Sequence, residues 1–289
     1  MKRNITPQLI MHYCQWLEEC EKSSHTIMRY KFHLGNFLEY IKDANLCKAM
    51  VLEWKEQLKM HLSPVTVNAA LAALNGLFKF CGWQDLVVRY LRVRKTTFCP
   101  EQRELKIQEY ERLVRTAMNQ NNERLALILQ TICATGIRIS ELQYITVETL
   151  ERKYAQVECK GGIRTVFLPT ELCEKLKRYV KKKQILGGMI FITRTGRAVD
   201  RSNIWREMKR LSEAANVWAE KIFPHNLRHL FARTYYEKEK DISRLADILG
   251  HSNVNTTKIY TIESGENHRK QIEGLKLVLS DYNEISLLL

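Results

Sequence analysis

The stretch ATGIRISEL at residues 134–142 places one arginine, Arg138, between Ile137 and Ile139 at the start of a predicted helix. A charged side chain with an apolar residue on each side does not suit a simple surface helix. Arginine stays charged at every accessible pH, and its planar fork matches two oxygens of one phosphate. The block therefore predicts an anion-binding arginine rather than a solvated one.

A second block, PHNLRH at residues 224–229, contains His225 and Arg228 three positions apart. Side chains with this spacing project from one face of a helix. Pro224 is favoured at the first position of a helix, where the backbone N–H groups also attract an anion. The block predicts a second arginine, with a histidine beside it, at the start of a helix.

The third block combines LGHSN at residues 249–253 with TTKIYT at residues 256–261, and it contributes His251 and Tyr260. A phenol has a pKa of about 10 and is a weak nucleophile unless cations stabilise it as it attacks. A DNA phosphodiester carries a negative charge that repels nucleophiles, and arginines neutralise it. Two arginines, two histidines and a tyrosine can therefore break and rejoin a DNA phosphodiester without a metal.

At these blocks the chain resembles the tyrosine recombinases, which include the phage integrases and the Xer-type recombinases. The resemblance is strong at residues 134–142, 225–233 and 249–261, and only architectural over residues 1–92. It implies that Arg138 and Arg228 bind the scissile phosphate. His225 matches the first histidine of the family's His-x-x-Arg.

The resemblance also implies the remaining roles. His251 stands where the family has histidine or tryptophan, and Tyr260 matches the nucleophile. Lys160, in the predicted turn Lys160-Gly161-Gly162, corresponds to the β-hairpin lysine that acts as general acid, and Glu141 to the acidic residue that supports the first arginine site. The family often has a basic residue where this chain has Ile163, a departure that bears on how the hairpin meets the minor groove.

The implied reaction has two steps of similar energy. The tyrosine attacks the scissile phosphate and forms a 3′-phosphotyrosine link, and the 5′ hydroxyl of a partner strand then releases the enzyme. No cofactor and no metal are expected, since the covalent link stores the bond energy. The sequence contains no P-loop pattern and no carboxylate cluster suited to two-metal catalysis.

Composition agrees with a nucleic-acid partner. The chain has 289 residues and a formal charge of +14, which favours DNA over a membrane surface because no single amphipathic basic segment dominates. No apolar run is long enough for a membrane span, and the N-terminus lacks a signal-peptide pattern. The eight cysteines have no zinc-ligand spacing and are predicted to be reduced and mostly buried. We therefore expect a cytoplasmic, nucleoid-associated protein.

The predicted fold is mainly α with a small β-hairpin sheet. Residues 1–92 are expected to form a helical core-binding (SAM-like) DNA-binding domain, residues 93–104 a basic linker, and residues 105–289 an α+β catalytic domain. Helices are expected near residues 10–17, 25–41, 48–61, 64–80, 108–118, 123–135, 171–183, 202–215, 225–239, 242–249 and 255–262. Strands are expected at residues 154–159, 164–168 and 189–193.

The segment from residue 263 to 289 is rich in leucine and isoleucine, and apolar residues this dense at a terminus need a partner surface. We expect it to dock on a neighbouring protomer in a tetramer assembled on DNA. The expected partners are double-stranded DNA with inverted-repeat core sites and other copies of the chain, with accessory DNA-bending proteins as further candidates. The chain starts almost directly with the helical domain, which favours a simple Xer-like recombinase over an integrase with an arm-binding domain.

Two other interpretations remain open. A type IB topoisomerase or a hairpin-forming resolvase uses a similar set of side chains, and its products would distinguish it from a recombinase. A DNA-binding regulator that has lost catalysis would keep the basic surface but would usually lose one of the expected residues, all of which are present here.

Overall fold

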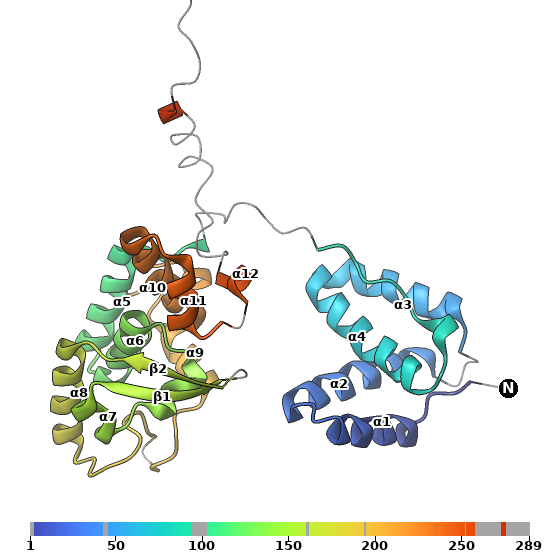
Figure 1. The fold of residues 1–289 in the computed structure, drawn as a ribbon, viewed down its shortest axis with the longest axis horizontal. Helices are drawn as coiled ribbons and strands as arrows, with labels where there is room; N and C mark the ends of the chain where they lie inside the picture. The colour runs from blue at the N-terminus through green and yellow to red at the C-terminus, as the bar shows by residue number, and fades with distance from the viewer. Residues whose placement is uncertain are drawn as a thin grey trace, which may run out of the picture. The chain divides into compact units, whose positions relative to one another are not determined.

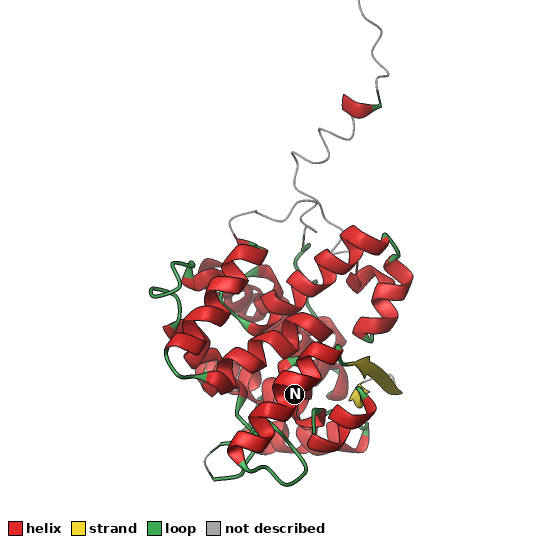
Figure 2. Cartoon of the chain, turned by 90° about the vertical axis from the view of Figure 1, so that its left-hand side faces the viewer, coloured by secondary structure: helices red, strands yellow, loops and turns green. Residues whose placement is uncertain are grey.

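The computed structural model describes residues 3–42, 46–93, 103–159, 162–193, 195–251, 253–257 and 273–275. The chain divides into two compact units, Met1–Lys95 and Thr96–Leu289. The division falls inside the stretch 93–104 that the sequence analysis interprets as a linker, although residues 94–102 lie outside the described part. Helices make up most of both units (Figure 2).

The first unit is helical throughout its described part. It contains α1 (Pro7–Glu19), α2 (Ser24–Ile41), α3 (Lys48–His61), α4 (Pro64–Phe80) and the 3₁₀ turn η1 (Gln84–Leu86). Three of these helices start at a hydroxyl cap that accepts a hydrogen bond from the first turn: Thr6, Ser23 and Ser63. The apolar helix α4 contacts α1, α2 and α3, and its buried leucines form the centre of the unit's core.

In its described part, the second unit combines helices with one antiparallel pair of strands. Its elements are α5 (Ile107–Asn119), α6 (Glu123–Thr135), η3 (Ile139–Tyr144), α7 (Val147–Arg152), β1 (Tyr154–Cys159), β2 (Gly162–Phe167), α8 (Thr170–Lys183), α9 (Arg201–Arg210), η4 (Ala219–Lys221), α10 (Pro224–Glu239), α11 (Ile242–Leu249) and α12 (Val254–Thr257). The strands pair in register from Tyr154 with Phe167 to Cys159 with Gly162. The mainly helical fold with a small sheet is confirmed.

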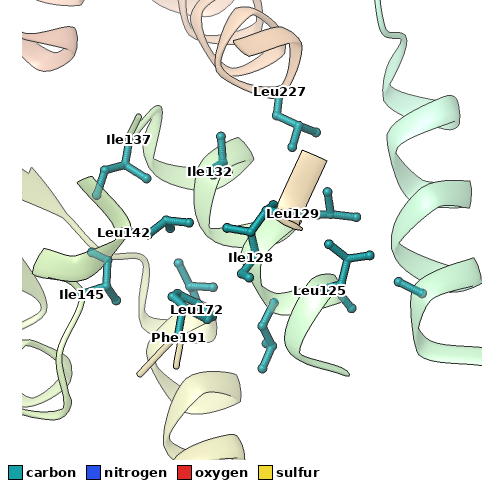
Figure 3. Close-up of a cluster of buried hydrophobic side chains, with 14 of the residues drawn as sticks. Leu125, Ile128, Leu129, Ile132, Ile137, Leu142, Ile145, Leu172, Phe191 and Leu227 are labelled. Atoms are coloured by element: carbon teal, nitrogen blue, oxygen red, sulfur yellow. The ribbon is translucent and has the colours of Figure 1, made fainter. Parts of the chain in front are cut away.

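Helix α6 is the centre of the second unit. It is largely buried and contacts α5, α8, α9 and α10 (Figure 1). Leu125, Ile128, Leu129 and Ile132 of α6 lie among apolar side chains of neighbouring segments (Figure 3). The helix ends at Gly136, whose positive φ of 65° lets the chain turn directly into the block that contains Arg138.

The structure corrects three details of the prediction. Residues 189–193 form isolated bridges, Thr146 with Met189 and Ile192 with Ala198, rather than a strand. The helix predicted at 202–215 ends at Arg210, and residues 211–216 form turns. Of the six cysteines with a described side chain only Cys173 is buried, so the prediction of mostly buried thiols is wrong.

Alanine substitutions at two helical glycines of the first unit should change stability in opposite directions. A Cβ on Gly76 of α4 would collide with the hydroxyl end of buried Tyr13, whereas a Cβ on Gly35 of α2 would meet nothing within 4 Å. Gly76→Ala should therefore lower the free energy of unfolding by about 1–3 kcal/mol through overpacking. Gly35→Ala should raise it by about 0.5–1 kcal/mol, because alanine favours helix. Urea unfolding of the full chain measures both, and stabilisation by both substitutions would contradict the packing at Tyr13.

Candidate active site

Arg138 lies immediately before η3, in extended backbone conformation after the turn at Gly136. Its backbone N–H and its Nη1 donate to the two carboxylate oxygens of Glu141, each at 2.8 Å. About a third of the Arg138 side chain stays exposed. Glu141 thus holds the arginine in place while part of the guanidinium still faces solvent, as expected for a side chain that binds an anion.

Glu141 is a buried carboxylate that two arginines share. Besides Arg138, it accepts a hydrogen bond from Nη2 of Arg164 on β2. Burial by itself would raise the pKa of Glu141, but the Arg138 hydrogen bonds and the charges of Arg164 and Arg138 outweigh it, so the pKa of Glu141 is lowered. The carboxyl group is therefore ionised at neutral pH.

The sequence analysis missed Arg164. A signal was present in the alternation of β2, where Arg164 and Val166 face inward while Ile163 and Phe167 are 68% and 74% exposed. A strand that turns its arginine to the core and its large apolar residues to solvent departs from ordinary alternation. That inversion indicates a specific partner for the buried charge.

Arg228, the fifth residue of α10, is only 1% exposed. Its Nη1 donates to the carbonyl of Gly136 at 2.5 Å, and its Nη2 donates to the carbonyl of Leu249 at 2.7 Å and lies 3.1 Å from Nε2 of His251. One guanidinium therefore connects α10 with the end of α6 and the end of α11.

His251 follows Gly250, the left-handed residue that ends α11. Because an arginine can only donate, Nε2 of His251 must accept from Arg228, and Nδ1 carries the proton and donates to Oγ1 of the buried Thr257 at 2.9 Å. Desolvation and the charge of Arg228 lower the pKa of His251 to about 4. The imidazole is thus neutral at pH 7, with one defined tautomer.

His225 occupies the second position of α10, and its ring packs edge-on against His229 one turn later, with centroids 5.0 Å apart. Desolvation and the charges of Arg228 and Arg138 lower the pKa of His225. His229, a further residue to which the sequence analysis gave no role, has a pKa lowered to about 4 by desolvation and by His225. Both rings are neutral at pH 7.

These side chains line two clefts that adjoin at Arg138 and Ser140. The first, of about 850 Å³, contains Arg138, His225 and Arg228, together with Trp205 and two arginines of α9. The second, of about 960 Å³, is lined by Arg138, Glu141 and His251, and by residues of β2. The fold thus brings together the predicted residues Arg138, Glu141, His225, Arg228 and His251. The other two predicted residues, Lys160 and Tyr260, lie outside the described residues.

The residues that the structure describes contain neither a cluster of metal-binding side chains nor a membrane-spanning helix. Among them no three histidine, cysteine, aspartate or glutamate side chains are grouped as a metal site would require. None of their helices is both long and apolar enough to cross a membrane.

Comparison with known proteins places this arrangement in a class. The Phage integrase family matches residues 103–266. Tyrosine recombinase XerA of Thermococcus kodakarensis is 28% identical over 279 residues, which cover 94% of this chain and 96% of that protein. XerD of Staphylococcus saprophyticus is 33% identical over 159 residues, or 52% of this chain and 54% of that protein.

Solved structures share the fold. XerH recombinase bound to its difH substrate has a TM-score of 0.69 and 22% identity, with 93% of this chain and 85% of that one covered. A lambda integrase dimer bound to a COC′ core site has a TM-score of 0.72 and 17% identity, with 88% and 94% covered.

The family match spans more than half of the chain, so the protein belongs to the Phage integrase family. It is a tyrosine recombinase, a member of a class of enzymes that break and rejoin DNA, and Xer recombinases are relatives over nearly its whole length. The resemblance that the three sequence blocks indicate is confirmed.

The neutral histidines make stability depend on pH. The pKa values of His229 and His251 fall to about 4 in the folded protein, against about 6.5 in an unfolded chain. From pH 6.5 down to 4 the unfolded state binds more protons, so the melting temperature should fall as pH decreases across this window. His251→Gln, which keeps a donor and an acceptor, should flatten the slope between pH 7 and 5. Thermal unfolding measures the melting temperature against pH. A slope for His251→Gln as steep as that of the wild type would contradict the lowered pKa of His251.

Proposed function

We propose that this protein is a site-specific recombinase that cleaves and rejoins DNA strands through a 3′-phosphotyrosine intermediate on Tyr260. The observation that carries the proposal is the convergence of Arg138, His225, Arg228 and His251, from three separate segments, on two adjoining clefts. Tyr260 follows the buried Thr257, which accepts from His251, by only three residues. The chain therefore passes the arginine cluster just before it reaches the tyrosine.

In the first step, the Tyr260 oxygen attacks the scissile phosphorus, and the bond from phosphorus to the 5′ oxygen breaks. The guanidinium groups of Arg138 and Arg228 stabilise the charge that accumulates on the phosphate oxygens. Lys160 protonates the departing 5′ oxygen, which would otherwise leave as a poor alkoxide. His225 is neutral at pH 7, so its ring can accept the phenolic proton of Tyr260, whereas Nε2 of His251 accepts from Arg228 and Nδ1 of His251 donates to Thr257.

In the second step, the 5′ hydroxyl of a partner strand attacks the phosphotyrosine and releases Tyr260. One phosphodiester is exchanged for another through a phosphodiester-like link, so the reaction needs no energy from ATP. The arginines supply the positive charge that a metal supplies in other phosphoryl-transfer enzymes.

The substrate is double-stranded DNA with inverted-repeat core sites. The formal charge of +14 supports binding to the phosphate backbone, which should weaken as salt rises. XerH and lambda integrase are seen in complex with difH and core-site DNA, the latter as a dimer, and similar folds support a comparable assembly here. We propose a tetramer on DNA, held by the segment after Tyr260, that acts on nucleoid DNA in the cytoplasm. The first unit would serve as the core-binding domain.

Covalent capture tests the nucleophile. Nicked duplexes from DNA adjacent to the gene are incubated in EDTA with the wild type and with Tyr260→Phe, and the products are separated on a denaturing gel. The wild type should give a protein–DNA band and Tyr260→Phe none, because a phenyl ring has no attacking oxygen. DNA affinity of the two proteins, measured by mobility shift, should be nearly equal. An equal covalent band from Tyr260→Phe would refute the assignment of the nucleophile.

Truncation tests the role of the terminal segment. A chain that ends at Ser264 lacks the leucine-rich residues that are proposed to dock on a neighbour. Binding of this chain to a single site should stay intact, while recombination between two sites should be lost, because synapsis needs contacts between protomers. A mobility shift measures single-site binding, and a two-site assay measures recombination. Undiminished recombination would contradict the docking role.

A further inference from the structure

Arg164 is a buried charge for which the proposed mechanism has no role. It lies on β2 and is 7% exposed. Its Nη2 donates to Glu141, and its Nη1 donates to the carbonyl of Ile248 in the last turn of α11 at 2.6 Å. Burial of a guanidinium is unfavourable unless hydrogen bonds and a counter-charge compensate for lost water, and both are present here.

The protein backbone makes room for this side chain. A Cβ on Gly250 would collide with Cδ of Arg164 and would lie 3.0 Å from its Nε. Gly250 also has a positive φ of 64°, which ends α11 and directs the chain to His251. The passage for the Arg164 side chain and the turn before His251 therefore depend on the same glycine.

We propose that Arg164 is a positioning residue that sets how Arg138 meets the scissile phosphate, and it does so through the shared carboxylate of Glu141. This inference rests on the proposed function. Arg164 shares the oxygen Oε2 with the backbone N–H of Arg138, and the side chain of Arg138 bonds Glu141 through Nη1 alone, at Oε1. The rest of the Arg138 guanidinium is left for the cleft.

Carboxylates prefer to hold arginine through two parallel hydrogen bonds. Without Arg164, Oε2 would lose a cationic partner, and Glu141 could draw Arg138 into such a pair. The N–H groups of Arg138 would then turn away from the phosphate. Arg164 prevents this by competing for the same carboxylate, and its bond to Ile248 fixes its own position relative to α11.

Arg164→Lys tests the inference, because lysine keeps the charge but cannot span both acceptors. The matched control is Arg124→Lys. Arg124 likewise bridges a carboxylate, Glu207, at 2.8 Å and a backbone carbonyl, Ile192, at 3.2 Å, and it lines neither cleft that contains Arg138. The probe is a nicked duplex that contains the site located by covalent capture. Its scissile position carries either a phosphodiester or an uncharged methylphosphonate. The single-turnover rate of adduct formation, DNA affinity and melting temperature are measured.

We expect Arg164→Lys to form the adduct about ten- to a hundredfold more slowly than wild type on the phosphodiester, with unchanged DNA affinity. The deficit should shrink on the methylphosphonate, because a neutral centre does not require the charge of Arg138. Arg124→Lys should match wild type on both substrates. A deficit of equal size on both substrates, or one no larger than that of the control, would overturn the inference.

A second pair of variants gives a result even if the lysine variant folds poorly. Arg164→Met should be slow, and Arg164→Met combined with Glu141→Gln should be faster, because a neutral amide no longer attracts Arg138. If Arg164 has a purely structural role, the double variant should be no faster than Arg164→Met. That result would overturn the inference. If the wild type forms no adduct through Tyr260, the proposed function itself fails. If the wild type forms the adduct and Arg164→Lys forms it at the same rate, only the inference about Arg164 fails.

Discussion

Buried guanidinium groups that must find acceptors inside the protein are the constraint on which the second unit depends. Arg228 is almost fully enclosed, so its N–H groups bond the carbonyls of Gly136 and Leu249. Those carbonyls are available as acceptors because each lies at the C-terminal end of a helix, where no following turn supplies an N–H donor. The ends of α6 and α11 are thereby fixed to the start of α10, and the candidate site lies where they meet.

The same constraint explains the local chemistry. Glycines at 136 and 250 end the two helices in the left-handed conformation, and bulkier residues would strike Phe231 and Arg164 respectively. Burial, together with the positive charge of the arginines, lowers the pKa of His251 and keeps its ring neutral. The site therefore combines permanent cations, suited to a phosphate, with imidazoles that are neutral at pH 7.

Much of this could be predicted from residue patterns. The bounds of α3, α4, α6 and α11 match the predictions because caps, glycines and apolar spacing are local signals. The alternation of β2 marks Arg164 as unusual, but its partners lie 23 and 84 residues away, so the sequence pattern does not identify them. The helix from Ser202 was extended too far because turns at residues 211–216 are set by tertiary contacts of their apolar residues. The roles of Lys160 and Tyr260 stay predictions.

The identity of the nucleophile is the central claim, and mass spectrometry of the covalent adduct tests it most directly. Trypsin should release the peptide from residue 259 to 269, whose only tyrosine is Tyr260. If Tyr260 is the nucleophile, this peptide carries a nucleotide linked through a 3′ phosphate to the Tyr260 oxygen. A nucleotide on any other residue, or a linkage through a 5′ phosphate, would contradict it.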